Sequence, residues 1–95
     1  SEISVIGNIL SALTRNPPAT IAGLTVSEFE DLSKSSLPTP GLRIRCGERV
    51  RVIIRPSGTE PKLKTYIEVV GNLEFADALV IKIKAEFAKL FASYS

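Results

Sequence analysis

The 95-residue sequence contains no histidine and a single cysteine, Cys46. Without histidine, the side chain that most often acts as an acid or base near neutral pH is missing. One cysteine cannot form an internal disulfide, which fits a reducing compartment, and we therefore expect a cytoplasmic protein. Alternation around Cys46 places it on the core side of a strand, which argues against a catalytic thiol.

Other sequence features that would signal a function are also missing. No apolar run is long enough to span a bilayer, and the pattern of a secretory signal does not occur. A Gly-x-x-x-x-Gly-Lys-Ser/Thr motif, which would indicate a nucleotide P-loop, is not found. Glu28, Glu30 and Asp31 form a small acidic cluster, but without histidine or metal-ligand spacing we interpret it as a solvated edge. We therefore expect neither a membrane partner nor a metal in this domain.

The composition describes one small globular domain covering residues 1–95. The sequence is 44% hydrophobic and 23% charged, with a net charge of +2, so bulk charge indicates no partner. Positive charge is nevertheless concentrated between Leu42 and Thr65. This stretch holds two acidic residues, Glu48 and Glu60, against seven basic ones, Arg43, Arg45, Arg49, Arg51, Arg55, Lys62 and Lys64.

A loop at the centre of this basic stretch reads Arg55-Pro-Ser-Gly-Thr-Glu-Pro-Lys62. Pro56 and Pro61 fix φ and remove backbone donors, so we expect no strand to run through them. Gly58 permits a turn, Ser57 and Thr59 bring hydroxyls, and the amides of this segment can form a small anion-binding nest. Arg55, at the expected strand end, can bind two oxygens of a phosphate.

A plain connecting loop is an equally good interpretation of this composition, because Ser, Gly, Thr and Pro are ordinary turn residues. Arg55 at one rim of the loop, with Lys62 and Lys64 at the other, favours the anion site.

The longer segment Arg55-Pro-Ser-Gly-Thr-Glu-Pro-Lys-Leu-Lys-Thr-Tyr66-Ile-Glu68 closely resembles the phosphate-binding signature of the α-D-phosphohexomutases, the phosphoglucomutase and phosphomannomutase family. In that family the signature lies in the C-terminal domain. Gly41-Leu-Arg-Ile-Arg45 and the amphipathic segment that closes the chain are similar to that domain too. The resemblance is weakest over the first forty residues.

The resemblance implies an isomerase of carbohydrate metabolism that moves phosphate between C1 and C6 of glucose or mannose phosphates. In the full enzyme, phosphoserine and Mg²⁺ carry out the transfer. The family's Ser-His-Asn-Pro, Asp-Gly-Asp and Gly-Glu-x-Ser motifs belong to three preceding domains and do not occur here. The chain is then expected to be the C-terminal domain, with no catalytic residue and no cofactor of its own, and its partners are the hexose phosphate and the other domains.

The resemblance also implies a role for each loop residue, which is to hold the phosphate that is not reacting. Arg55 clamps this phosphate bidentately, Ser57 and Thr59 donate hydroxyl hydrogen bonds, and the amide of Gly58 approaches closely. Lys62 and Lys64 contribute positive charge at the rim. Sugar preference would be decided elsewhere, in the missing sugar loop.

Periodicity predicts a helix at each end of the chain. Apolar residues three and four apart predict a helix over residues 1–15, which Asn16-Pro-Pro18 ends. Asn72 is a plausible N-cap for a second helix. The core face of the second helix is expected to hold Phe75, Leu79, Ile83, Phe87 and Leu90.

Between the helices, period-two alternation predicts strands over residues 42–46, 49–54 and 63–70, with a turn at Gly47-Glu48. Residues 20–32 are ambiguous: Leu24-Thr-Val26 favours a strand, whereas Ser27-x-x-Glu30 has the form of a capping box. The resemblance implies a strand there. Residues 33–41 read as a surface loop.

These elements predict an α+β fold of two layers: a four-stranded, mainly antiparallel sheet with two helices on one face. The resemblance implies a fold similar to the TATA-box-binding-protein-like domain. The other face of the sheet is expected to be mostly basic.

That basic face suggests a second function, a small nucleic-acid-binding module, with Arg43, Arg45, Arg49, Arg51, Arg55 and Lys64 along a phosphate backbone. Only Tyr66 interleaves these charges, however, and stacking platforms usually use more aromatic residues. A purely structural interaction domain is a third interpretation, but it leaves the loop without a purpose.

Overall fold

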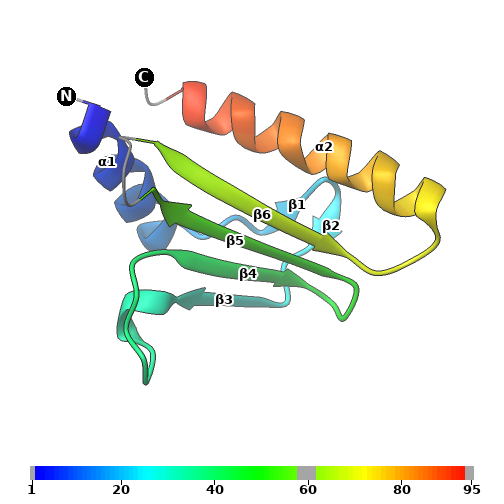
Figure 1. Ribbon diagram of the computed structural model, residues 1–95, viewed down its shortest axis with the longest axis horizontal. Helices are drawn as coiled ribbons and strands as arrows, with labels where there is room; N and C mark the ends of the chain where they lie inside the picture. The colour runs from blue at the N-terminus through cyan, green and yellow to red at the C-terminus, as the bar shows by residue number, and fades with distance from the viewer. Residues whose placement is uncertain (1, 58–61, 94–95) are drawn as a thin grey trace.

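The computed structural model describes residues 2–57 and 62–93, and the side chains of residues 5–57 and 62–93. The chain begins with helix α1 and ends with helix α2, and strands lie between them (Figure 1). The elements are α1 (Glu2–Arg15), β1 (Thr20–Ile21), β2 (Leu24–Thr25), β3 (Glu28–Asp31), the 3₁₀ turn η1 (Leu32–Lys34), β4 (Leu42–Cys46), β5 (Val50–Pro56), β6 (Leu63–Val69) and α2 (Leu73–Ala92).

The main sheet has four antiparallel strands in the order β3-β4-β5-β6. Ile44 of β4 lies opposite Val52 of β5, which in turn lies opposite Ile67 of β6. β1 and β2 form a separate two-stranded ribbon. The predicted α+β fold is therefore confirmed. The pattern at Leu24-Thr-Val26 favours a strand, and β2 lies there, but its pairing with β1 in a separate ribbon was not predicted.

One face of the sheet carries the core. The inward side chains of β4 and β5 are buried, and both helices place buried side chains in the same cluster, so the two helices cover one face. This arrangement follows from alternation, because every second side chain of a strand points to the same face. The buried cluster consists of Ile9, Leu13, Ile21, Leu42, Ile44, Cys46, Val50, Val52, Ile54, Leu79, Ile83 and Phe87.

Helix α2 begins where the sequence predicts. The side chain of Asn72 accepts a hydrogen bond of 2.9 Å from the backbone amide of Phe75, as an N-cap residue does. Phe75 itself is 43% exposed, so its predicted place in the core is wrong. Its ring lies against Gly71, and it lines a surface hollow together with Cys46 and Val50.

The ambiguous segment, residues 20–32, contains the short strands β1, β2 and β3 and no α-helix. β3 pairs with β4, and the hydroxyl of Ser27 donates to the carbonyl of Arg45 and accepts from the amide of Gly47. Ser27 therefore fixes the chain beside the β4–β5 turn and does not cap a helix. The β1–β2 turn has positive φ at Ala22 and Gly23, and the amide of Ala22 donates to Glu86 of α2.

Two glycines give a matched pair of stability predictions. Gly41 has a φ of +136°, and a Cβ there would lie 2.7 Å from the carbonyl oxygen of Ile54. Gly7 lies in α1 with nothing within 4 Å of its Cβ position. In urea denaturation we expect Gly41→Ala to lower the free energy of unfolding by about 1–3 kcal/mol. Gly7→Ala is expected to raise it by about 0.5–1 kcal/mol. Equal effects of the two substitutions would contradict the described backbone.

Candidate anion-binding site

The candidate loop joins the end of β5 to the start of β6. The amide of Ser57 donates a 2.8 Å hydrogen bond to the carbonyl of Lys62, which closes the base of the loop. Pro56 is the last residue of β5 and lies opposite Leu63, so the strand ends at this proline and does not run through it, as expected. Its missing N–H is tolerated because the strand ends there. Pro61 lies outside the described residues. Gly58 and Thr59, two of the predicted site residues, lie outside the described residues.

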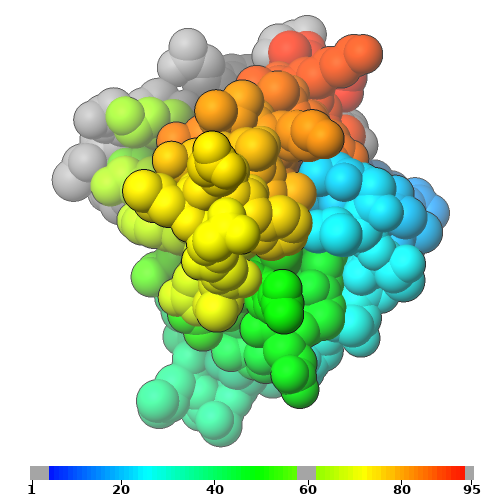
Figure 2. All heavy atoms as spheres, turned by 90° about the vertical axis from the view of Figure 1, so that its right-hand side faces the viewer, coloured from blue at the N-terminus to red at the C-terminus, as the bar shows by residue number. Residues whose placement is uncertain are grey.

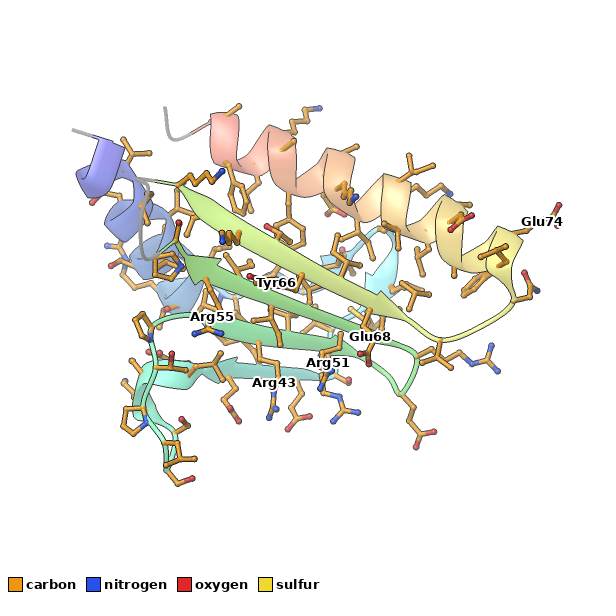
Figure 3. All side chains as sticks on the ribbon, in the orientation of Figure 1. Arg43, Arg51, Arg55, Tyr66, Glu68 and Glu74 are labelled. Carbon is orange, nitrogen blue, oxygen red and sulfur yellow. The ribbon has the colours of Figure 1, made fainter. Side chains whose placement is uncertain are left out.

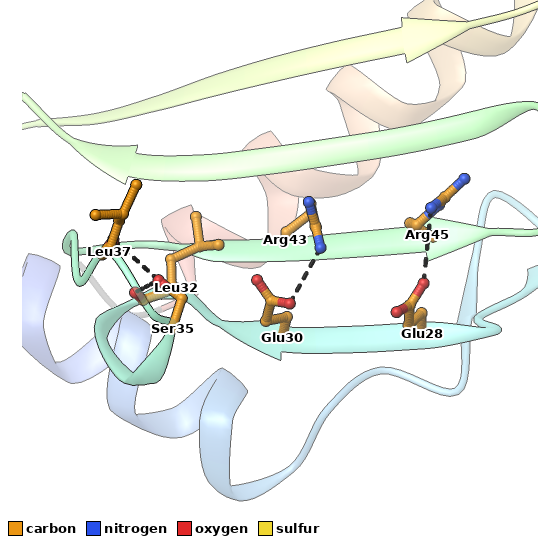
Figure 4. Close-up of polar contacts among 7 residues, drawn as sticks. All are labelled: Glu28, Glu30, Leu32, Ser35, Leu37, Arg43 and Arg45. Carbon is orange, nitrogen blue, oxygen red and sulfur yellow. Dashed lines mark hydrogen bonds and ion pairs between the residues drawn. The ribbon is translucent and has the colours of Figure 1, made fainter.

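The open face of the sheet, away from the helices, carries arginines that are paired with acids. Arg43 contacts Glu30 at 3.0 Å and Arg45 contacts Glu28 at 3.8 Å, in both cases between β4 and β3 (Figure 4). Arg51 of β5 contacts Glu68 of β6 at 3.0 Å, and Figure 3 shows this pair on the side away from α2. Three arginines of this predominantly basic face are therefore ion-paired, which the sequence pattern did not predict.

Glu28 and Glu30 lie on a solvated edge of the sheet, as expected, with side chains that are 58% and 38% exposed. They occupy the edge strand β3 and neutralise the neighbouring strand. Asp31 accepts hydrogen bonds from the hydroxyl and the amide of Ser33, and these lower the pKa of its carboxyl below its usual range. Among the described residues, no group of three His, Cys, Asp or Glu side chains is arranged to hold a metal ion.

Arg55 and Lys64 form the contrasting pair on the same face. They lie directly opposite each other on β5 and β6, and both side chains are exposed. Within residues 2–57 and 62–93, neither is within ion-pair distance of a carboxylate. Like charges directly opposite each other on a sheet are destabilising. This end of the sheet therefore holds two positive charges that an anion would stabilise.

Arg55 also contacts the segment of residues 33–41, for which the sequence predicts only a surface loop. Nη2 of Arg55 donates a 3.2 Å hydrogen bond to Oγ1 of Thr39. A Cβ on Gly41 would lie only 3.0 Å from Cγ of Arg55, so this glycine lets the loop approach the arginine stem. Sixteen residues separate Thr39 from Arg55, and no local pattern indicates that they meet.

Cys46 lies at the far end of β4, beside a hollow of about 360 Å³ lined also by Leu24, Gly47 and Phe75. Figure 2 shows that end, where the β1–β2 ribbon (cyan), the β4–β5 turn (green) and the start of α2 (yellow) meet. The thiol is 7% exposed. Burial, and secondarily the charge of Glu86, raise its pKa above the usual thiol range. Cys46 is therefore a core residue with a low thiolate content at neutral pH.

We expect Cys46 to react with a thiol-specific reagent such as DTNB at least about a hundredfold more slowly in the folded chain than in urea, because reaction requires local opening. The rate should increase with pH only above the usual thiol range, since a raised pKa keeps the sulfur protonated to higher pH. The measurement is absorbance against time at several pH values. Equal rates in buffer and urea would show that the thiol is accessible.

The chain is similar to known proteins over most of its length. Residues 13–90 match the phosphoglucomutase/phosphomannomutase C-terminal domain family. A probable phosphomannomutase of Haemophilus influenzae is 44% identical over 72 residues, covering 76% of this chain and 15% of that protein. A phosphoglucosamine mutase of Francisella tularensis is 33% identical over 87 residues, covering 88% of this chain and 19% of that protein. The chain thus spans less than a fifth of each relative. Among the described residues, no helix is long and apolar enough to cross a membrane.

Proposed function

Because the chain belongs to the phosphoglucomutase/phosphomannomutase C-terminal domain family, we propose that it binds the phosphate of a hexose phosphate within a longer phosphohexomutase. The longer enzyme transfers phosphate between C1 and C6 of the sugar. This chain holds the phosphate that is not reacting, and residues 1–95 form the C-terminal, substrate-phosphate-binding domain of that enzyme.

The structural observation that supports the proposal is the uneven pairing of charge on the open face. Arg43, Arg45 and Arg51 each contact a carboxylate. Arg55 and Lys64, at the loop, have no such partner among the described residues and face each other. Solubility alone does not require two like charges directly opposite each other, because such a pair is destabilising. A dianionic phosphate would be attracted to the pair.

Each proposed contact follows from the chemistry of the side chain. A guanidinium carries five N–H donors, so Arg55 can keep Thr39 and still bind a phosphate through two parallel hydrogen bonds. Ser57 and Thr59 would donate hydroxyl hydrogen bonds, and Gly58 would let its amide approach the phosphate. Lys62 and Lys64 would add charge at the rim. Of these residues, Gly58 and Thr59 lie outside the described residues and enter from the sequence alone.

Holding the non-reacting phosphate supports a reaction that occurs elsewhere in the enzyme. A group fixed at one end of the substrate removes part of the entropy cost of placing the other end correctly. Mg²⁺ would supply charge neutralisation at the transferred phosphoryl group. We assign Mg²⁺ and the phosphoserine to the other domains, as the resemblance to the family implies.

The nucleic-acid alternative loses its main support on this face. A groove that follows a phosphate backbone needs several unpaired cations in a row, but three of the six predicted residues contact carboxylates. Tyr66 is 52% exposed and has no second aromatic partner on the described part of the face.

We expect Arg55→Ala to weaken the binding of glucose 1-phosphate at least about tenfold, because charge-assisted hydrogen bonds contribute about 1.5–3 kcal/mol. The fold should be unchanged, since the side chain is exposed. The measurement is a backbone-amide NMR titration of the 95-residue chain. Arg51→Ala is the matched control: it removes the same charge from the same strand, but at an arginine that is already ion-paired, and should change affinity less than threefold.

Equal losses in the two variants would mean that bulk charge and not the loop binds the ligand, and would contradict the proposal. A short single-stranded oligonucleotide is titrated in parallel. Shifts spread over residues 43–51 with the oligonucleotide, decreasing steeply with salt, would favour the nucleic-acid function.

The sugar should matter little to this chain alone. The names of the relatives include both phosphomannomutase and phosphoglucosamine mutase, and every contact proposed above is to the phosphate. We expect glucose 1-phosphate, mannose 1-phosphate and glucosamine 1-phosphate to bind within about threefold of one another, a difference below 1 kcal/mol. A tenfold preference, measured by the same titration, would place a sugar-reading contact within these 95 residues.

A further inference from the structure

The segment between η1 and β4, residues 35–41, lies at the same end of the sheet as the proposed phosphate site (Figure 1). From its contacts we propose that Thr39 is a component of this site: its hydroxyl accepts a hydrogen bond from Arg55, orients the guanidinium, and donates its own hydrogen to the bound anion. This inference rests on the proposed function and extends it to a residue outside the loop Arg55–Lys62.

The segment is held by its own hydrogen bonds. The carbonyl of Leu32 accepts from the amide of Thr39 at 3.1 Å and from the amide and hydroxyl of Ser35, while the amide of Leu32 donates to Gly41 at 2.9 Å. The hydroxyl of Ser35 also contacts the carbonyl of Leu37 (Figure 4). Leu32 therefore fixes both ends of the segment, so the backbone of Thr39 has a defined position beside β5.

The side chain of Thr39 is suited to orient a neighbour. Its β-branched carbon restricts χ1, and it is half-buried in a segment whose tip residue, Leu37, is 85% exposed. Oγ1 of Thr39 lies 3.2 Å from Nη2 of Arg55. Among the described residues, this is the single hydrogen bond of the Arg55 side chain to protein.

Thr39 holds the end of the Arg55 guanidinium, and Gly41 leaves room for the arginine stem, because a Cβ there would lie 3.0 Å from Cγ of Arg55. A long arginine side chain loses about 2 kcal/mol of rotamer entropy when it is fixed. If part of that ordering is already present before the ligand arrives, the ligand binds more tightly.

The Thr39 hydroxyl can also donate a hydrogen bond of its own. Thr39 uses an oxygen lone pair to accept from Arg55, so its own hydrogen can be donated elsewhere. An anion bound by the guanidinium lies within one hydrogen bond of Nη2, and hence close to Oγ1. The same geometry thus supplies orientation of Arg55 and one further direct contact.

The test uses Thr39→Val, which keeps the shape and removes the hydroxyl, and Thr39→Ser, which restores it. Thr25→Val, at an exposed threonine of β2, is the matched control. Glucose 1-phosphate is titrated into each 95-residue chain, and the order parameter of the Arg55 Nε–H group is measured by ¹⁵N relaxation without ligand. A merely structural threonine would leave that order parameter unchanged.

We expect Thr39→Val to weaken glucose 1-phosphate binding by about threefold to tenfold, the effect of one hydrogen bond, and to lower the order parameter of Arg55. Thr39→Ser and Thr25→Val should stay within about twofold of the parent. If Thr39→Val does not fold, as judged by its amide spectrum, Thr39→Ala replaces it.

Unchanged affinity and unchanged Arg55 order in Thr39→Val would overturn this inference while leaving the proposed function intact, provided Arg55→Ala still loses binding. If the parent chain binds no glucose 1-phosphate and Arg55→Ala changes nothing, the proposed function is overturned. In that case the proposed contact between Thr39 and the anion is overturned too. The order parameter still decides whether Thr39 orients Arg55.

Discussion

The strict alternation of β4 and β5 is the constraint on which the rest of the structure depends. In each strand, every second side chain is buried against the helices, and the residues between them face away from the core. A shift of register by one residue would move arginines into the core and isoleucines to the open face. Burial of a charged side chain without a partner is so costly that this alternative is strongly excluded. The register then decides which charges meet across the open face.

The ion pairs of the open face follow from that register. Glu28 lies opposite Arg45, and Glu30 opposite Arg43, because β3 aligns with β4. Arg51 lies opposite Glu68 for the same reason, because β5 aligns with β6. Exposed pairs of this kind contribute little to stability, about 0–1 kcal/mol each. Their larger effect is on the distribution of charge, since they leave Arg55 and Lys64 as an unneutralised pair at one end.

The parts of the fold that depend on local pattern could be predicted from the sequence, and the parts that depend on tertiary contact could not. Alternation identified β4, β5 and β6, and the preference of Asn72 for capping identified the start of α2. Alternation also identified which face carries the arginines, but not that β3 supplies acids to them, because a pairing between strands requires their register. Phe75 was misplaced for a related reason: its spacing fits the helical stripe, but at the start of α2 its ring lies against Gly71 and lines an open hollow.

In the candidate site too, some residues could be predicted from local sequence and one could not. Arg55, Ser57, Lys62 and Lys64 are adjacent in sequence and could be grouped by their chemistry. Thr39 could not, because its contact with Arg55 depends on the path of residues 32–41, which Leu32 and Gly41 determine. A Thr in a segment rich in Ser and Pro indicates a loop and nothing more.

Distance explains why the local arrangement, and not the total charge, decides where an anion binds. Arg51 is four residues from Arg55 along β5, about 13 Å in an extended strand. Charges separated by more than about 8 Å are largely screened at physiological ionic strength, so even without Glu68 the charge of Arg51 would contribute little at Arg55. Lys64, directly opposite on the neighbouring strand, is within that range. Two adjacent positive charges repel each other, and each of them attracts an anion, so an anion between them offsets their repulsion. The proposed site therefore needs only a few residues at the ends of two strands, held in place by the segment that contacts Arg55.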